Sequence, residues 1–294
     1  MDLLEGRRLV IFGCGYIGSA VARTAAARGA KVTALTRNLE NGAALRAEGI
    51  AVVVGDLAGE EWHAQIPGKA DFVLNCVSSG GGGLDGYRRS YVDGMASVIA
   101  WARRQGPAGT MVYTGSTSVY SQGGGVAVDE STLTHGGGER AELLLQAEDL
   151  LRAAEGARRR WFVLRLAGIY GPGRHHVLDQ VRAGEVAGVG GNRLNLAHRD
   201  DIVSAIVMCL TAPAELASDI FNVADDDPAP KRDVVAWLET TMGLPAPRFT
   251  GEASTMGRAV TPDRIILNAK LKVRLGWRPT YPTFREGYAS FLSR

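Results

Sequence analysis

The residues with the clearest chemistry are the glycines of the segment GCGYIG at positions 13–18, a G-x-G-x-x-G pattern. The segment follows a short apolar run at residues 8–12 and precedes an alanine-rich stretch with helical spacing at residues 17–28. Between a strand and a helix, the first glycine allows a tight turn, the second lets the backbone approach a pyrophosphate, and the third lets helix and strand pack closely. The amides and the positive end of the helix would face the anion. The pattern predicts a dinucleotide site that includes Gly13, Gly15, Tyr16, Ile17 and Gly18.

The residue after the second apolar run bears on which dinucleotide fits. After residues 31–36 the chain continues with Arg37 and Asn38, and no acidic residue stands there. An acid would accept a hydrogen bond from the ribose 2′-hydroxyl of NAD, whereas an arginine suits the 2′-phosphate of NADP. Arg37 therefore favours NADP over NAD, with NAD and a solvated Arg37 as the alternative. Asp56, after a third apolar run, would lie near the adenine, although aspartate also stabilises such turns by itself.

A parallel sheet is needed to position these residues, and the order of apolar and helical segments predicts one. The apolar runs lie at residues 8–12, 31–36, 51–54, 71–77, 111–114 and 161–166, and helical patterns at 39–48, 91–105 and 139–154 lie between most of them. This alternation predicts an α/β fold with a Rossmann-type doubly wound parallel sheet. We expect a dinucleotide-binding domain at residues 1–170. Residues 171–294, rich in glycine and proline, would form a smaller C-terminal substrate lobe, with a strand at about 219–223 returning to the sheet.

Composition narrows the class of protein. The 294 residues carry a formal net charge of only +2, which gives no reason to expect nucleic acid or an anionic membrane as a partner. The three cysteines, Cys14, Cys76 and Cys209, form no C-x-x-C pair. We therefore expect no disulfide framework, and we expect the protein to lie in a reducing compartment. No apolar run approaches ~18 residues, the length that suggests a membrane span. We therefore expect a cytoplasmic protein that acts on a small molecule.

Several motifs taken together resemble one known family. They are GCGYIG (13–18), GDL (55–57), YVDG (91–94), VYTGSTSVYS (112–121), DEST (129–132), RLAGIYGPGR (165–174), HRDDIVSAI (198–206), FNVADDDP (221–228) and LGWRPTYPTFREG (275–287). In these motifs the chain resembles the extended short-chain dehydrogenase/reductases, also called the NAD-dependent epimerase/dehydratase group. Within this group it resembles most an atypical branch of small proteins. The resemblance covers almost the whole chain and implies NADP or NAD as cofactor. Members of the family often form homodimers through two helices beside the active site.

The resemblance also points to a departure in the catalytic helix. The family uses a tyrosine and a lysine at positions i and i+4, where the ammonium lowers the pKa of the phenol. No tyrosine of this sequence has a lysine four residues later. Counted back from Glu148, which resembles the acid at the end of that helical motif, the two positions hold Arg140 and Leu144. Dehydrogenase or epimerase chemistry by the usual route is therefore not expected.

Other residues could supply the missing acid–base chemistry. The resemblance implies that Ser116 lies beside the nicotinamide and that Tyr170 lines the same end of the cofactor, although Ser116 could serve only a turn and Tyr170 only packing. Histidine as a residue type titrates near neutrality, so His175 could act as acid or base. Glu130 and His135 precede the altered helix and could each take over the proton transfer. The adjacent histidines lack the spacing of a helical metal pair, so no metal site is expected.

The remaining candidates concern the substrate. A basic cluster around Arg174 and His176 could anchor an anion, while Asn192 and Arg193 resemble the family's substrate-side stretch. The aspartates at 225–227 read more simply as a solvated turn than as a metal cluster. We expect an enzyme acting on a small hydroxylated or anionic metabolite by isomerisation, elimination or an atypical reduction. The alternative is a non-enzymatic module that senses or regulates through NADP.

Overall fold

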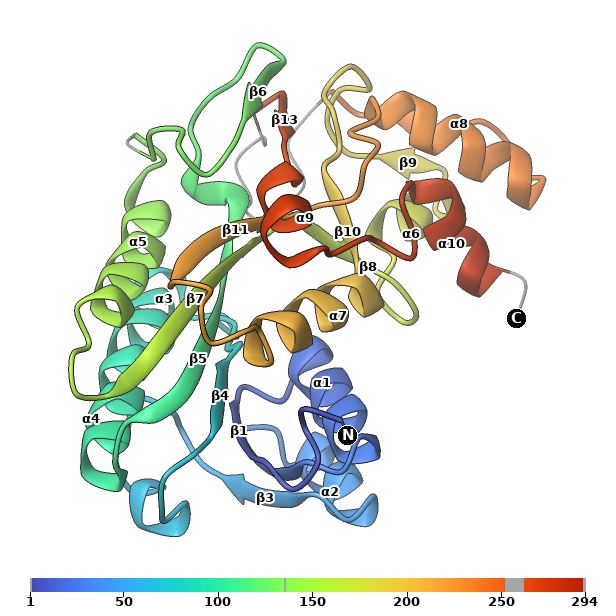
Figure 1. The fold of residues 1–294 in the computed structure, drawn as a ribbon. Coiled ribbons are helices and arrows are strands. Elements are labelled where there is room, and N and C mark those ends of the chain that lie inside the picture. The colour runs from blue at the N-terminus through green and yellow to red at the C-terminus, as the bar shows by residue number, and fades with distance from the viewer. Residues whose placement is uncertain (1, 135, 252–261, 293–294) are drawn as a thin grey trace. The chain divides into compact units, whose positions relative to one another are not determined.

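The computed structural model describes residues 2–134, 136–251 and 262–292 (Figure 1). The chain divides into two compact units, each built from separated stretches of sequence. Unit 1 consists of Met1–Val119, Gly137–Arg165 and Val203–Phe221. Unit 2 consists of Tyr120–Gly136, Leu166–Ile202 and Asn222–Arg294. The boundary expected at residue 170 stays a prediction.

Unit 1 is built on a parallel sheet. Within the described part of the chain, seven strands form this sheet in the order β11-β7-β5-β4-β1-β2-β3. This order, with β1 at the point where the winding reverses, confirms the predicted doubly wound Rossmann-type sheet. Ile11 of the central strand pairs with Ala34 on one side and Leu74 on the other, and all three are buried. The strands are β1 (Arg8–Phe12), β2 (Lys31–Thr36), β3 (Ala51–Val54), β4 (Phe72–Asn75), β5 (Ala108–Ser116), β7 (Arg158–Leu166) and β11 (Asp219–Val223).

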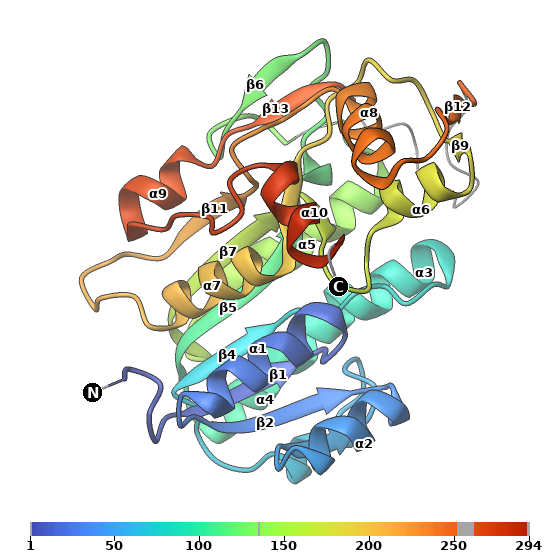
Figure 2. The same cartoon turned by 90° about the vertical axis from the view of Figure 1, so that its right-hand side faces the viewer.

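Helices cover both faces of this sheet. Figures 1 and 2 show α1 (Tyr16–Ala27) and α2 (Leu39–Ala47) on one face and α4 (Gly94–Gln105) and α5 (Glu139–Arg152) on the other. A π-helix, η2 (Arg88–Asp93), joins the short α3 (Gly83–Tyr87) to α4. Short 3₁₀ turns lie at η1 (His63–Gln65) and η3 (Thr117–Val119), and α7 (Arg199–Leu210) contributes residues to both units.

The core beneath α4 and α5 is rich in aromatic rings. The ring of Phe12 lies 4.8 Å from that of Trp62 and 5.4 Å from that of Trp101, measured between centroids. Buried aliphatic residues of the two helices, such as Val98 and Leu151, belong to the same cluster. Apolar burial of this kind stabilises the sheet whose strand ends carry the site.

Unit 2 contains three small strand pairs and four helices among its described residues. The pairs are β8 (Gly168–Tyr170) with β10 (Leu196–His198), β9 (Glu185–Val186) with β12 (Arg248–Phe249), and β6 (Val126–Val128) with β13 (Arg264–Ile266). The helices are α6 (His176–Arg182), α8 (Lys231–Met242), α9 (Ala269–Leu275) and α10 (Phe284–Leu292). Its core includes Leu178, Leu238 and Phe284.

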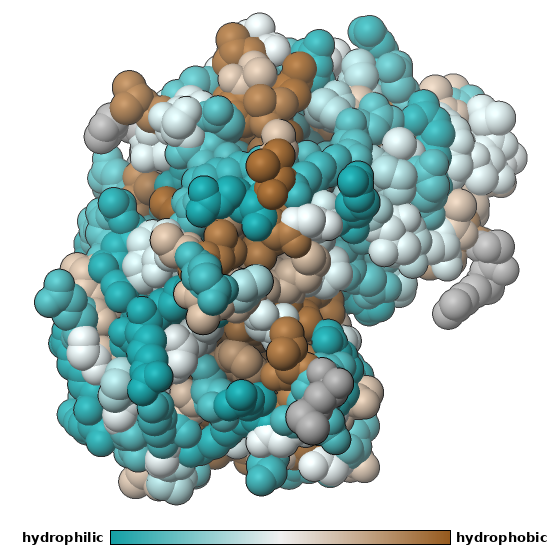
Figure 3. Space-filling model, viewed as in Figure 1, coloured by the Kyte–Doolittle hydropathy of each residue, from teal (hydrophilic) through white to brown (hydrophobic). Residues whose placement is uncertain are grey.

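The surface in view is mostly hydrophilic, with hydrophobic side chains gathered in smaller patches (Figure 3). In the described ranges no helix is both long and apolar enough to cross a membrane.

Candidate dinucleotide site

The first and third glycines of the 13–18 segment are required by the backbone of unit 1. Gly13 has a φ of 94°, and a Cβ built on it would lie 2.7 Å from both N and Cα of Val77. A Cβ on Gly18 would collide with the carbonyl oxygen of Gly13 and lie 2.8 Å from Cys76 Sγ. A larger residue at Gly18 would push α1 away from the end of β1, and one at Gly13 would collide with the backbone that follows β4. The geometry is therefore that of a tight turn closely packed under a helix.

The second glycine stands where a ligand could approach. Gly15 is the N-cap of α1, and no side chain caps the helix there. A Cβ built on Gly15 would have no atom within 4 Å. The first turn of α1 carries no acidic residue, and Ile17 is buried while Tyr16 is half-buried. Because a helix N-terminus presents backbone amides and a positive dipole, this cradle fits the diphosphate of a dinucleotide.

Arg37 lies at the end of β2, as expected, and its guanidinium reaches the loop after β4. A Cβ on Gly80, whose φ is 62°, would lie 2.5 Å from Arg37 Nη2, so the guanidinium lies against the backbone at Gly80. The neighbouring Asn38 caps α2 by accepting a hydrogen bond from the Asn41 amide at 2.8 Å. Arg37 itself is exposed and can reach a ligand from this edge of the sheet.

Asp56, after β3, is held by two donors. It accepts hydrogen bonds from the Ala58 amide at 3.1 Å and from Arg89 Nε at 2.9 Å. Partial burial opposes its ionisation, but the Ala58 bond and the charges of Arg89 and Arg37 outweigh that effect and lower the pKa of Asp56. Sequence reasoning missed Arg89, because nothing in the sequence pairs it with a residue 33 positions earlier.

Ser116, the last residue of β5, takes part in a turn. Its Oγ accepts a hydrogen bond from the Ser118 amide at 3.1 Å, and the residue is half-buried. This bond matches the turn alternative left open by the sequence. A role for Ser116 beside the nicotinamide stays a prediction.

The two positions at which the resemblance leads us to expect the family's tyrosine and lysine lie on α5 and have different surroundings. Leu144 is 3% exposed and packs in the core of unit 1. Arg140 lies in the first turn of α5, with its guanidinium carbon 5.2 Å from the centroid of the Tyr87 ring. Further along α5, Glu148 forms a buried two-bond ion pair with Arg165 at 2.7 and 3.0 Å. Glu148 therefore holds α5 against β7.

Tyr170 is a core residue of unit 2. Its ring centroid lies 5.0 Å from that of Tyr288 and 5.3 Å from that of His198. Its hydroxyl packs against Gly287 and has no hydrogen-bond partner among the described residues. Burial raises the pKa of the Tyr170 phenol. Its position thus fits the packing alternative, and a catalytic role stays a prediction.

His175 has a carboxylate partner that the sequence analysis did not name. His175 Nδ1 and Asp179 Oδ1 lie 2.8 Å apart across the first turn of α6, and the imidazole stacks on Phe291. Such a pair orients an imidazole, and the i, i+4 spacing was the signal that could have revealed it. His176 Nε2 lies 2.8 Å from Gln180 Nε2 in the same helix. The neighbouring Arg174 forms a backbone bridge with Gly171.

The two further substrate candidates of unit 2 are engaged within the protein. Arg193 donates to Asp263 from its backbone amide at 2.9 Å and pairs with the same carboxylate at 3.0 Å through Nη1. The Asn192 carbonyl accepts a hydrogen bond from the Lys231 amide at 2.9 Å. Recruiting Arg193 to a substrate would require breaking its bond with Asp263.

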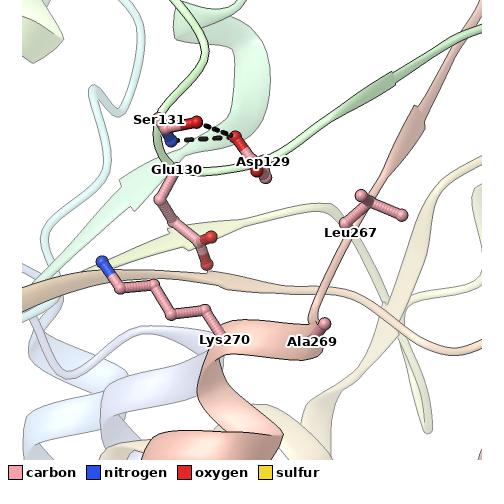
Figure 4. Close-up of a pocket in the computed structure, with 6 residues that line it drawn as sticks. All are labelled: Asp129, Glu130, Ser131, Leu267, Ala269 and Lys270. Carbon is pink, nitrogen blue, oxygen red and sulfur yellow. Dashed lines mark hydrogen bonds between the residues drawn. The ribbon is translucent and has the colours of Figure 1, made fainter.

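Glu130 lines a pocket of about 340 Å³ in unit 2 (Figure 4). One of its oxygens accepts a hydrogen bond from the Asn222 amide at 2.6 Å, and burial raises the pKa of Glu130. Asp129 beside it accepts hydrogen bonds from Ser131 and thereby forms a turn. His135, the other acid–base candidate of this segment, lies outside the described residues. The pocket is lined by Asp129, Glu130, Ser131, Leu267, Ala269 and Lys270.

The expectation of a solvated turn at residues 225–227 is wrong for Asp225. This side chain is 5% exposed, and burial raises its pKa to about 9. Its Oδ1 accepts a hydrogen bond from the Asp227 amide, while Oδ2 has no partner within the described structure. His198, in the same unit, is also buried, which lowers its pKa to about 4. Both groups are therefore uncharged at neutral pH.

The doubly wound sheet and the glycine cradle at its first strand–helix turn define a nucleotide-binding Rossmann protein. The model of the NAD dependent epimerase/dehydratase family matches residues 9–224. The chain belongs to this family, as its motifs led us to expect.

Similar proteins span nearly the whole chain. Protein YeeZ of Escherichia coli K12 is 26% identical over 282 residues, 94% of this chain and 97% of YeeZ. A 2-alkyl-3-oxoalkanoate reductase of Stenotrophomonas maltophilia is 28% identical over 255 residues, 81% of this chain and 76% of that enzyme. A functionally unknown conserved protein from Silicibacter pomeroyi matches with a TM-score of 0.76 and 25% identity over 98% of both chains. MoeE5, solved with UDP-glucuronic acid and NAD, has a TM-score of 0.81 at 20% identity over 96% of both chains, a likeness that shows the fold alone.

Proposed function

We propose that the protein binds NADP at the cradle of unit 1 and uses it to act on a small hydroxylated or anionic metabolite. The observation that carries this proposal is the open position at Gly15, flanked by two glycines that the turn itself requires. The backbone amides at the start of α1 would hold the diphosphate. When bound, the cofactor supplies or accepts a hydride.

The preference for NADP rests on Arg37. The side chain after β2 is a guanidinium, and its charge acts on Asp56, whose carboxylate also accepts a hydrogen bond from Arg89. A guanidinium can bind a phosphate through two parallel hydrogen bonds, so these two arginines would suit a phosphate at this end of the sheet. NAD as the physiological cofactor is the alternative, because MoeE5, a structural neighbour, was solved with NAD.

The chemistry of the metabolite step is proposed to differ from the usual phenol–ammonium relay. The resemblance places Arg140 and Leu144 at the two relay positions, and the buried Leu144 can neither bind a ribose nor tune a phenol. Ser116, Glu130, Tyr170 and His175 remain the proposed acid–base residues; His175 gains support from its carboxylate partner Asp179. Isomerisation, elimination or an atypical reduction would each fit, and reductase activity in a relative of 28% identity favours the last.

Substrate recognition is proposed to use residues of unit 2. Arg174 and His176 stand at the start of α6, and Asn192 and Arg193 precede β10. Of these, Arg193 is the weakest candidate because Asp263 already neutralises its charge.

A second function, a non-enzymatic module that binds NADP and reports on it to a partner, is favoured by the packing of Leu144 in the core.

The experiment that separates the enzyme from the sensing module begins with a fluorescence titration of the purified protein with NADPH and NADH. Tighter binding of NADPH supports the proposal, and equal affinities would refute the preference for NADP. The same protein is then incubated with NADPH and a panel of ketones, enones and nucleotide sugars. Turnover of any of them supports an enzyme, whereas binding without turnover across the panel supports the sensing module.

A further inference from the structure

Two arginines from distant parts of the chain converge on one carboxylate at the carboxyl end of the sheet in unit 1. Arg89 pairs with Asp56 at 2.9 Å, and the charge of Arg37 acts on the same carboxylate. Arg37 comes from the end of β2, whereas Arg89 comes from the helical segment before α4. The Arg37 guanidinium is steadied against the backbone at Gly80, where a side chain would leave it no room.

The element that carries Arg89 is unusual. It is the π-helix η2 (Arg88–Asp93), inserted between α3 and α4. π-helical turns are rare, and they occur frequently at functional sites. The wider turn changes the direction in which η2 side chains leave the helix relative to a regular α-helix. Ser90 of this segment anchors it by donating a hydrogen bond to the Ser79 carbonyl at 3.3 Å.

The pair with Asp56 is not explained by stability. The side chain of Arg89 is 58% exposed and that of Asp56 36% exposed. Ion pairs as exposed as this contribute little to folding, because solvent screens them. The positive charges of Arg89 and Arg37 both act on Asp56, and its single negative charge cannot neutralise the two of them. A phosphate group, which guanidinium forks bind with two parallel hydrogen bonds, would neutralise the positive charge that remains.

We propose that Arg89 is a second specificity-determining residue for the 2′-phosphate of NADP, acting together with Arg37. This inference rests on the proposed binding of a dinucleotide at the glycine cradle. Without ligand, Asp56 keeps the Arg89 guanidinium at the rim of the site. With ligand, Arg37 and Arg89 would approach the phosphate from the two elements that carry them.

The test compares two small probes that differ only in the 2′-phosphate. Adenosine 2′,5′-bisphosphate and adenosine 5′-monophosphate are titrated by calorimetry into the parent protein and into Arg89→Ala and Arg37→Ala. We expect the parent to prefer the bisphosphate and each substitution to reduce that preference by about tenfold, the size of one charge-assisted hydrogen bond. Affinity for the monophosphate should stay within about twofold of the parent, since no phosphate contact is lost.

Two further variants make the result specific. Arg23→Ala removes an arginine of similar exposure that pairs with Glu48 at 2.7 Å, and it should leave the preference unchanged. Arg89→Lys keeps the charge but loses the fork, and it should retain part of the preference. Because Arg89 is exposed, its variants should unfold at the same temperature as the parent.

The inference is overturned if Arg89→Ala keeps the full preference of the parent while Arg37→Ala loses it. It is equally overturned if Arg89→Ala weakens both probes alike, since Arg89 would then act on the adenosine through Asp56. If the protein does not bind a dinucleotide at all, the result is different: neither NADPH nor NADH binds the parent protein.

Discussion

Replacing Asp225 by asparagine should stabilise the protein, although the aspartate lies in the core of a folded unit. The residue is 5% exposed, and its pKa of about 9 lies far above the ordinary aspartate value of 3.8. Burial is the main cause, and the nearby charges of Asp226, Asp227 and Asp201 act in the same direction, while the Asp227 amide opposes them. At neutral pH the folded protein therefore holds a proton on Asp225 that the unfolded chain releases.

The magnitude follows from the two pKa values. Since the folded state binds the extra proton, the free energy of unfolding falls by about 1.4 kcal/mol for each pH unit between the two values. The stability that the proton on Asp225 contributes to the folded state is fully present below pH ~4 and is lost as the pH rises to about 9. At pH 7 the cost is about 4 kcal/mol. Asparagine is neutral at every pH and can still accept the hydrogen bond from the Asp227 amide, so Asp225→Asn should regain up to this amount.

Urea unfolding of the parent and of Asp225→Asn at pH 5, 6, 7, 8 and 9 checks this prediction. The gap in the free energy of unfolding should widen steadily with pH. Asp227→Asn is the matched control, because that side chain is partly exposed and pairs with Arg285 at 2.9 Å. The prediction is wrong if Asp225→Asn is no more stable than the parent at pH 8, or if the free energies of unfolding of the two proteins change with pH in parallel.

Three further outcomes are expected. Arg37→Ala should narrow the difference between the NADPH and NADH affinities, measured by fluorescence titration, and an unchanged difference would count against the NADP preference. Glu148→Ala should lower the free energy of unfolding by about 3–5 kcal/mol in urea titrations, since it removes the buried carboxylate that pairs with the Arg165 guanidinium; a loss below about 1 kcal/mol would contradict the role of this pair. Arg140→Ala should leave any native activity with NADPH intact, and a large drop in turnover would show that α5 takes part in the chemistry after all.

The local parts of the fold could be predicted from the sequence. The helix expected at residues 17–28 is α1 (Tyr16–Ala27), and the one expected at 39–48 is α2 (Leu39–Ala47). Both follow from helical spacing and from glycines close to their ends, which are properties of neighbouring residues. The glycine segment at 13–18 could equally be recognised, because its spacing and its place between a strand and a helix are local properties of the sequence.

Contacts between distant residues could not be predicted in this way. Arg89 meets Asp56 across 33 positions, and Arg193 meets Asp263 across 70. The burial of Asp225 depends on how unit 2 folds around it, whereas three consecutive aspartates before a proline suggest only a polar turn. The π-helix that carries Arg89 has no simple sequence signature, so only the structure shows that Arg89 lies beside Asp56.

The central claim, that backbone amides at the start of α1 hold the diphosphate, is tested most directly by NADPH binding to Gly15→Ala. The φ of Gly15 is −86°, outside the left-handed range that favours glycine, and a Cβ there would have no atom within 4 Å apart from those of its two chain neighbours. The variant should therefore fold and unfold like the parent, while its new methyl group occupies space that the diphosphate needs. NADPH should bind this variant at least about tenfold more weakly than the parent, at an unchanged unfolding temperature. Parent-like affinity in a normally folded Gly15→Ala protein would contradict the central claim.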